Sequence, residues 1–272
     1  MKVLLVAAAA VALATAAAAS AGPAATPPPT LHPGVLTVGL DPPVVGFQVG
    51  TLRGSKVINP RGFEIDIAKG IAAKLGISKI NYIKVPFTVL FRPGTKPFDL
   101  AFEEATITAA RARQVAFSAP YFTANQGVLV SKKVAAAGKV PKTLAALRQL
   151  QTCAQAVTTG LGYIQHRLHP VKQPLIYQTT AAAFTAVQNG SCDALVLDTP
   201  LIALQKKTKP SAYGPVAGQI VTNEKYGAVM PKGSKLKPAV DTAIKALAAN
   251  RTLLKLQKKW FNTNFAKVYI LK

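Results

Sequence analysis

The chain has 272 residues, of which 50% are hydrophobic, and carries 33 Lys and Arg against 10 Asp and Glu, a formal net charge of +23. So large an apolar fraction excludes a disordered chain, and two cysteines are too few for a disulfide-rich scaffold. The basic residues never run longer than two in a row, which favours a solvated lysine-rich surface over a nucleic-acid-binding face.

Residues 1–21 have the pattern of a secretory signal peptide. Lys2 precedes an apolar run, and Ala19-Ser20-Ala21 forms a small-residue cleavage site. Residues 22–33, which are rich in proline, are predicted to form a flexible leader. No later segment is long and apolar enough to span a bilayer, so we expect a soluble protein in the periplasm or otherwise outside the cytoplasmic membrane.

The first half of the chain alternates strands with helices. A strand over 35–40 ends at Asp41, and apolar residues at helical spacing predict a helix over 63–75. Further along the chain we predict strands over 80–85 and 98–102, a helical turn over 109–113 and a strand over 127–131. This order is typical of an α/β unit.

The second half repeats the rhythm, so a second α/β unit is expected. Helices are predicted over 144–150, 161–167 and 181–188, and strands over 153–157, 175–177, 194–197 and 226–230, followed by an amphipathic region over 240–260. The strand over 194–197 ends at Asp198. Acidic residues at the carboxyl ends of strands stand where α/β folds bind ligands.

Six motifs, taken in order, resemble the periplasmic solute-binding proteins that deliver polar amino acids to ABC importers. They are 38–41, 62–68, 98–99 leading to 106–111, 117–121, 192–198 and 259–261. The resemblance implies the α/β, two-lobed periplasmic-binding-protein (Venus flytrap) fold, with two hinge strands and the ligand in the cleft. We expect 34–121 with 225–272 in lobe 1, and 122–224 in lobe 2.

The resemblance implies that Arg111 and Asp198 hold the two poles of an amino acid. A guanidinium offers two parallel donors to a carboxylate, and the hydroxyl of Thr106 is expected to add another. Asp198 matches the family aspartate that binds the ammonium. The alternative is that Asp198 caps the following helix before Pro200.

Two more threonines, Thr158 and Thr159, lie between a strand and a helix, where backbone N–H groups and hydroxyls can meet an anion. Family members usually have glycine before the threonine, and Val157 stands there in this chain. The alternative is that both threonines are simple N-caps.

Selectivity is expected from lobe 1. Asp41, Glu103 and Glu104 lie at strand ends that face the same cleft in this fold, and Phe87 is a candidate apolar wall or a core residue. A family aromatic near Asp41 is replaced by Val44. The excess negative charge favours a cationic ligand such as arginine, lysine or histidine, unless the glutamates turn away or pair with Lys96 or Arg113.

The two cysteines, Cys153 and Cys192, begin strands that are neighbours in the family's strand order, so a disulfide is expected in an oxidising compartment, with two buried thiols as the alternative. His166 and His169 have no acid or cysteine close in sequence and are interpreted as surface residues, so no metal site is predicted.

The sequence thus predicts a binding protein, not an enzyme, with no catalytic cycle of its own. We expect it to need no cofactor, to bind no nucleic acid and to act as a monomer with a membrane ABC permease. One alternative is a periplasmic enzyme similar to cyclohexadienyl dehydratase, with Glu103 or Glu104 as general acid. A second is a sensor that presents its ligand to a membrane receptor.

Overall fold

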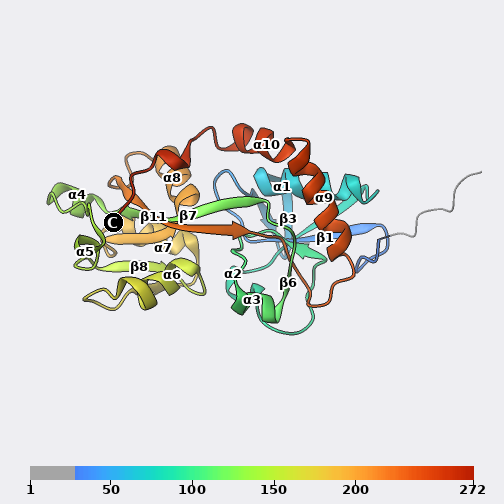
Figure 1. Ribbon diagram of the computed structural model, residues 1–272, viewed down its shortest axis with the longest axis horizontal. Coiled ribbons are helices and arrows are strands. Elements are labelled where there is room, and N and C mark those ends of the chain that lie inside the picture. The colour runs from blue at the N-terminus through green and yellow to red at the C-terminus, as the bar shows by residue number, and fades with distance from the viewer. Residues whose placement is uncertain (1–27) are drawn as a thin grey trace, which may run out of the picture.

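The computed structural model describes residues 28–272, so the predicted signal peptide and the first part of the predicted leader lie outside the described residues. The chain folds into two α/β lobes that lie side by side and are joined by long strands (Figure 1). None of the helices within 28–272 has the length and apolar character needed to cross a membrane.

Lobe 1 is built on a seven-stranded sheet in the order β2-β3-β4-β1-β5-β12-β6. The strands are β1 (Val35–Leu40), β2 (Val49–Arg53), β3 (Lys56–Arg61), β4 (Lys79–Lys84), β5 (Leu100–Ala101), β6 (Ala116–Phe117) and β12 (Val229–Met230). Its helices are α1 (Phe63–Lys74), α2 (Phe87–Leu90), α3 (Ala109–Gln114), α9 (Lys237–Ala249) and α10 (Thr252–Trp260). β1 is central and parallel to β4 and β5, which explains why its side chains are almost wholly buried.

Lobe 2 is built on a five-stranded sheet in the order β11-β7-β10-β8-β9. The strands are β7 (Phe122–Val130), β8 (Thr152–Gln155), β9 (Leu175–Tyr177), β10 (Ala194–Asp198) and β11 (Val216–Tyr226). Its helices are α4 (Lys132–Ala136), α5 (Leu144–Leu147), α6 (Thr159–Tyr163), α7 (Thr180–Asn189) and α8 (Thr199–Thr208). A π-helical turn over Ile164–Leu168 continues α6, where one regular helix over 161–167 is predicted.

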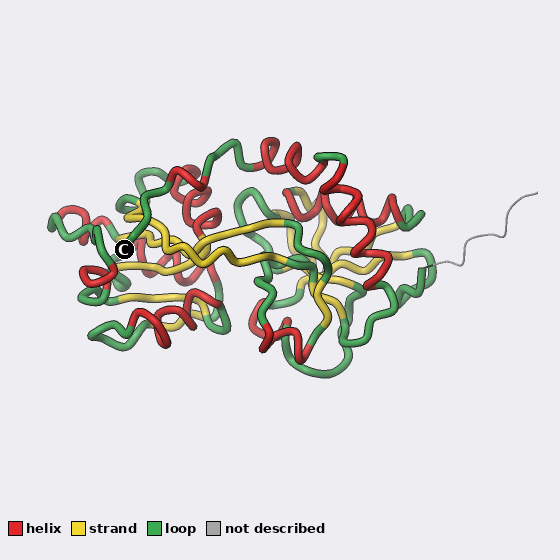
Figure 2. Tube along the Cα trace, in the orientation of Figure 1, coloured by secondary structure: helices red, strands yellow, loops and turns green. Residues whose placement is uncertain are grey.

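Two antiparallel strands, β7 and β11, form the hinge. The chain crosses into lobe 2 along β7 and returns along β11, and both strands run from one lobe to the other (Figures 1 and 2). Their lobe 1 ends are anchored in an aromatic cluster, in which Phe122 stacks on Tyr226 at 5.4 Å and meets Phe47 edge-on at 5.6 Å. Residues on both hinge strands therefore lie between the two lobes.

The predicted strand over 226–230 is wrong as a single element. Tyr226 ends β11, which belongs to the sheet of lobe 2, and β12 begins only at Val229, in the sheet of lobe 1. The apolar run continues through the break because both ends are buried, so hydrophobicity alone did not reveal it. The β2–β3 hairpin and β11 were not predicted, and a helix at the place of α8 was considered only in the alternative that Asp198 caps it.

The chain crosses between the lobes a third time at its end. Beyond α10, a 3-10 turn over Phe265–Lys267 leads to Ile270, which pairs with Gln219 of β11. Leu271 is buried in the core of lobe 2, and the carbonyl oxygen of Lys272 accepts from the backbone N–H of Leu144. The last residues thus lie on lobe 2, whereas the expected lobe 1 included all of 225–272.

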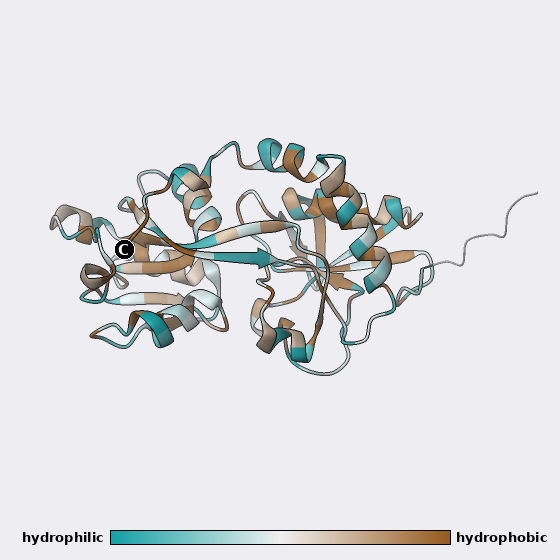
Figure 3. Ribbon diagram, viewed as in Figure 1, coloured by the Kyte–Doolittle hydropathy of each residue, from teal (hydrophilic) through white to brown (hydrophobic). Residues whose placement is uncertain are grey.

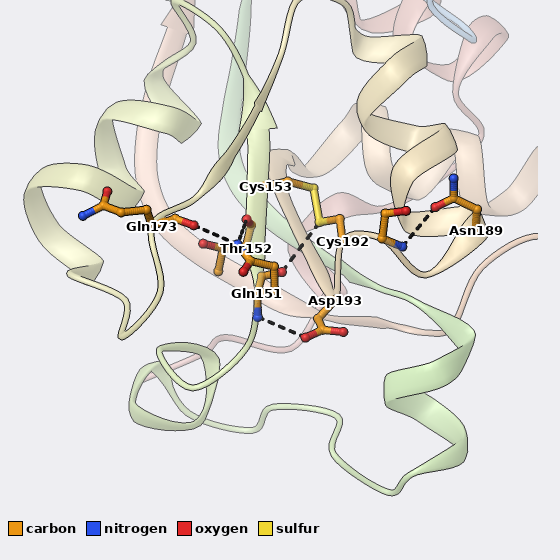
Figure 4. Close-up of a disulfide and its surroundings, with 8 residues drawn as sticks. Gln151, Thr152, Cys153, Gln173, Asn189, Cys192 and Asp193 are labelled. Atoms are coloured by element: carbon orange, nitrogen blue, oxygen red, sulfur yellow. Dashed lines mark hydrogen bonds between the residues drawn. A yellow bond between two sulfur atoms is a disulfide. The ribbon is translucent and has the colours of Figure 1, made fainter.

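Hydrophobic residues lie along the central strands of each sheet, and hydrophilic ones lie mainly on the outer helices (Figure 3). In lobe 2 a disulfide joins Cys153, in β8, to Cys192, just before β10, with Cα atoms 6.0 Å apart (Figure 4). The two strands are parallel neighbours, and Leu195 pairs with Cys153. The disulfide therefore lies at the ends of β8 and β10 opposite Gln155 and Asp198.

Candidate functional site

A cavity between the lobes is lined by all nine residues predicted to bind ligand. Lobe 1 contributes Asp41, Val44, Phe87, Glu103, Glu104, Thr106 and Arg111. Lobe 2 contributes Gln155, Thr158, Thr159, Thr180, Leu197, Asp198 and Leu201. The nine residues come from loops, strand ends and the first turns of short helices that are far apart in the sequence, and the closed arrangement of the lobes brings them together.

Arg111 lies in α3 and links the two lobes. The hydroxyl of Thr108 caps this helix by accepting from the backbone N–H of Arg111 at 3.1 Å. The guanidinium donates from Nη1 to the carbonyl oxygen of Thr106 at 2.7 Å and from Nη2 to that of Val157, in lobe 2, at 2.9 Å. Its Cζ lies 4.1 Å from the ring centroid of Phe91, so an aromatic face supports it.

Burial lowers the pKa of Arg111 to about 10, against the opposing effect of Asp198 and Glu224. The group therefore remains a cation at neutral pH. Because a guanidinium has five N–H donors and these two bonds use only two of them, Arg111 has donors left for a carboxylate in the cavity.

Asp198 occupies the N-cap position of α8, but its side chain makes no capping hydrogen bond. Instead Oδ1 accepts from Nε2 of Gln126 at 2.6 Å, and Oδ2 accepts from the hydroxyl of Tyr226. The side chain of Asp198 therefore does not cap α8, which was the alternative role expected for it. Burial, with a contribution from Glu224, raises the pKa of Asp198 to about 7.

The threonines of the cavity give their hydroxyl protons to other groups of the protein. Thr158 is the N-cap of α6, and its hydroxyl donates to the carbonyl oxygen of Gln155 at 2.7 Å. The hydroxyls of Thr106 and Thr159 both donate to Oε2 of Glu224 at 2.6 Å. Because a hydroxyl has a single proton, these threonines can offer only lone pairs to a ligand in the cavity. Thr106 is therefore an acceptor toward the ligand, whereas the sequence led us to expect a donor.

The backbone turn before Thr158 is unusual at Val157, where the resemblance leads us to expect glycine. Val157 has φ = 65°, in the left-handed region that glycine adopts freely and β-branched residues rarely enter. The hydrogen bond from Arg111 holds its carbonyl oxygen in this orientation.

On the lobe 1 side, Asp41 accepts from the backbone N–H of Phe87 at 3.0 Å and lies 3.9 Å from Nζ of Lys84. Burial raises the pKa of Asp41. The Phe87 ring packs edge-on against Phe91, with centroids 5.4 Å apart, so it forms part of the cavity wall and also contacts the core.

Glu103 and Glu104 line the cavity, and Glu64 lies behind them. Oε1 of Glu64 accepts from the backbone N–H of Glu104 at 2.9 Å and from the hydroxyl of Tyr121, and Nε2 of Gln48 lies 3.2 Å from Oε1 of Glu104. Burial raises the pKa of Glu104 well above its usual range, and Glu64 raises it further.

Glu103 differs from its neighbours because its carboxylate has no partner. The residue is 2% exposed, yet neither Oε1 nor Oε2 accepts a hydrogen bond. Burial, then Asp41 and Glu64, raise the pKa of Glu103 well above its usual range. Neither expected cation pairs with it, since Lys96 donates to the carbonyl oxygen of Leu90 and no ion pair within 28–272 includes Arg113.

Six of the ten carboxylates of the chain lie in the cavity wall or directly behind it: Asp41, Glu64, Glu103, Glu104, Asp198 and Glu224. Arg111 is the single cation among the residues that line the cavity. The site therefore offers many acceptors and few donors, which suits a ligand rich in N–H groups. Sequence reasoning missed Glu224, because it follows no predicted strand and its neighbours are polar.

His166 and His169 lie at the π-helical turn, away from the cavity, and within 28–272 no three His, Cys, Asp or Glu side chains are grouped to hold a metal ion.

Two hinged lobes that close on a polar cavity define a protein that captures a small ligand. Residues 36–263 match the model of the bacterial extracellular solute-binding proteins, family 3. The chain belongs to this family, whose members act outside the cytoplasm.

Known relatives of the chain are binding proteins. The chain is 29% identical to ABC transporter arginine-binding protein 1 of Escherichia coli K12, over 74% of this chain and 81% of the relative. An ancestral arginine-binding protein bound to glutamine has a TM-score of 0.73, with 28% identity over 85% of this chain and 99% of that chain. An ancestral amino-acid-binding protein that is a precursor of cyclohexadienyl dehydratase has a TM-score of 0.71, with 30% identity over 84% and 95%.

Proposed function

We propose that the protein captures an amino acid with a cationic side chain between its lobes and delivers it to an ABC import permease. The predicted signal peptide at 1–21 would direct export, and the monomer would present its closed form to the permease. Family membership and relatives named for amino-acid binding support this assignment. No catalytic cycle is part of the proposal.

Arg111 and Asp198 face the cavity from opposite lobes, so a zwitterion placed between them meets a cation at one pole and an anion at the other. The free N–H groups of Arg111 receive the α-carboxylate. Asp198, with the lone pairs of Thr106 and Thr159, receives the α-ammonium. Burying both charges of the ligand is favourable only with such compensation.

The observation that carries the cationic assignment is the unpartnered carboxylate of Glu103. A buried carboxylate without hydrogen bonds is costly, and a cation or strong donor placed against it relieves that cost. Asp41 and Glu104 lie in the same part of the wall and add negative charge. A guanidinium or ammonium side chain therefore fits better than a neutral amide or a carboxylate.

Isothermal titration at pH 8 with L-arginine, L-lysine, L-glutamine and L-glutamate tests the assignment. We expect the cationic amino acids to bind more tightly than glutamine, and glutamate to bind most weakly. Glu103→Gln should weaken arginine binding at least about 10-fold and glutamine binding much less, because it removes a charge that only the cation uses. Asp193→Asn, the same charge change outside the cavity, is the matched control. Tighter binding of glutamate than of arginine would overturn the cationic assignment.

The enzymatic alternative has its own test. Glu103 and Glu104 retain protons more strongly than ordinary glutamates, which is a property of general acids as well as of cation sites. Incubation with prephenate and with arogenate should leave both compounds unchanged by product analysis. Turnover of either compound would replace the binding assignment with an enzymatic one.

A further inference from the structure

Glu224, on hinge strand β11, is bonded to both lobes but does not line the cavity. Its Oε2 accepts from the hydroxyls of Thr106 and Thr159, each at 2.6 Å. Its Oε1 accepts from Nε2 of Gln126 at 3.0 Å. The carboxylate therefore lies behind the wall that the two threonines form.

The two threonines belong to different lobes. Thr106 forms a β-bridge with Tyr226, next to the point where β11 enters lobe 1. Thr159 is the first residue of α6 in lobe 2, and Gln126 is paired with Asp198 in the sheet of that lobe. Glu224 thus connects a residue fixed to lobe 1 with two residues fixed to lobe 2.

The local backbone is built to direct Glu224 toward these partners. The register between β11 and β7 shifts between Ile220 and Glu224, and Asn223 has φ = 52°, which asparagine tolerates better than most residues. Oδ1 of Asn125 accepts from the backbone N–H groups of Thr222 and Asn223, at 3.1 and 3.0 Å. Irregularities of this kind commonly redirect a side chain.

Short hydroxyl-to-carboxylate hydrogen bonds are stronger than neutral ones. When the lobes open, Thr159 moves with lobe 2 while Thr106 stays with lobe 1, so Glu224 keeps both bonds only in the closed arrangement. A contact present in only one of two conformations shifts the equilibrium toward that conformation.

We propose that Glu224 is an interlobe clasp that favours closure whatever the ligand is. Its contribution to affinity is then the same factor for every ligand that requires the closed form, in contrast to a residue that contacts the ligand. Glu224 is a positioning residue acting through Thr106 and Thr159, and the affinity part of this inference rests on the proposed function.

The test compares Glu224→Gln, which keeps the shape and removes the charge, with Glu224→Asp, which keeps the charge and shortens the reach. Both should weaken L-arginine and L-glutamine binding by the same factor, on the order of 10-fold, leaving their ratio unchanged. Small-angle scattering without added amino acid should show a larger radius of gyration than for the parent protein. Asp193→Asn, a charge change near the disulfide and away from the hinge, should alter neither readout.

Unchanged or tighter binding by both variants, or a changed arginine-to-glutamine ratio, would overturn the clasp. If the parent protein binds no amino acid, the proposed function fails, and scattering alone decides the clasp: more open variants support it and unchanged ones refute it. If the Glu224→Gln variant does not fold, the Glu224→Asp variant, which keeps the charge, tests the clasp by the same two measurements.

Discussion

Nη2 of Arg111 in lobe 1 donates a hydrogen bond to the carbonyl oxygen of Val157 in lobe 2, across 2.9 Å. The bond joins the proposed carboxylate-binding residue to a backbone turn in which a β-branched residue has a positive φ. Closure of the lobes and the geometry of the ligand site are therefore coupled at this contact.

Arg111→Ala should abolish amino-acid binding while the protein stays folded. The substitution removes the single cation of the cavity wall, so a ligand carboxylate would be buried without compensation. We expect at least about a 100-fold loss of affinity by titration, consistent with losing a charge-assisted contact in a buried site. Arg113→Ala, an exposed arginine on the same helix, should bind as the parent does. Parent-like affinity in Arg111→Ala would refute the assigned role.

Arginine affinity should fall as the pH is lowered from 8 to 5.5. Burial raises the pKa of Asp198 to about 7, so the carboxyl is ionised at the upper pH and mostly protonated at the lower one. Because an ammonium requires the ionised form, Kd should rise at least about 10-fold, the ionised fraction changing by that order across this range. Titrations in buffers of different ionisation enthalpy should show proton release near pH 7. A Kd independent of pH would contradict this role.

The raised pKa of Asp198 also affects the stability of the protein without ligand: stability should rise as the pH is lowered, whereas arginine affinity falls. The folded protein holds the Asp198 proton more tightly than the unfolded chain, so this group's contribution to stability is complete below its ordinary pKa of 3.8 and is lost as the pH rises through about 7. Asp198→Asn should therefore stabilise the protein without added ligand at pH 8, by about 2 kcal/mol, while abolishing binding. Urea denaturation at pH 8 and pH 4 measures both effects, and a variant that is less stable than the parent at pH 8 would contradict the sign.

Val157→Gly should stabilise the protein. The left-handed conformation costs a β-branched residue roughly 1–3 kcal/mol, which exceeds the entropic cost of glycine of roughly 0.5–1 kcal/mol. Val157 is 48% exposed, so little packing is lost, and we expect a net gain of about 1 kcal/mol in urea denaturation. Val171→Gly, at an exposed valine without positive φ, should be neutral or destabilising. Equal destabilisation by both substitutions would show that residue 157 is not strained.

Reduction of the disulfide should destabilise the protein. Cys153 and Cys192 are 39 residues apart, and constraining a loop of that length in the unfolded chain contributes about 4 kcal/mol in the chain-entropy model. Urea denaturation with and without dithiothreitol measures the loss. The Cys153→Ala/Cys192→Ala variant should match the reduced protein and not respond to the reductant. A midpoint unaffected by dithiothreitol in the parent would contradict the prediction.

The sequence by itself determined the α/β class, the family and the strand ends at which Asp41, Glu103, Glu104 and Asp198 stand. Strand periodicity and turn residues are local signals, and the T-I-T-x-x-R pattern around Arg111 is a contiguous motif, so both can be read without a fold. The sequence also showed valine at position 157, where the resemblance leads us to expect glycine, but the backbone conformation of that residue came only from the structure.

Only the tertiary structure decided what depends on partners distant in the chain. Glu224 lies in a polar stretch with no strand signal, and its importance comes from Thr106 and Thr159, which are 118 and 65 residues away. The same holds for the carboxylate of Glu103, which has no hydrogen-bond partner, and for the hydroxyl protons of the threonines, which point to other protein groups. It also holds for the third crossing between the lobes, which ends near Leu144. The hydrophobic pattern of a sequence indicates which face of a helix or strand is buried. Which groups donate and which accept hydrogen bonds inside the cleft depends instead on the side chains that closure of the lobes brings together.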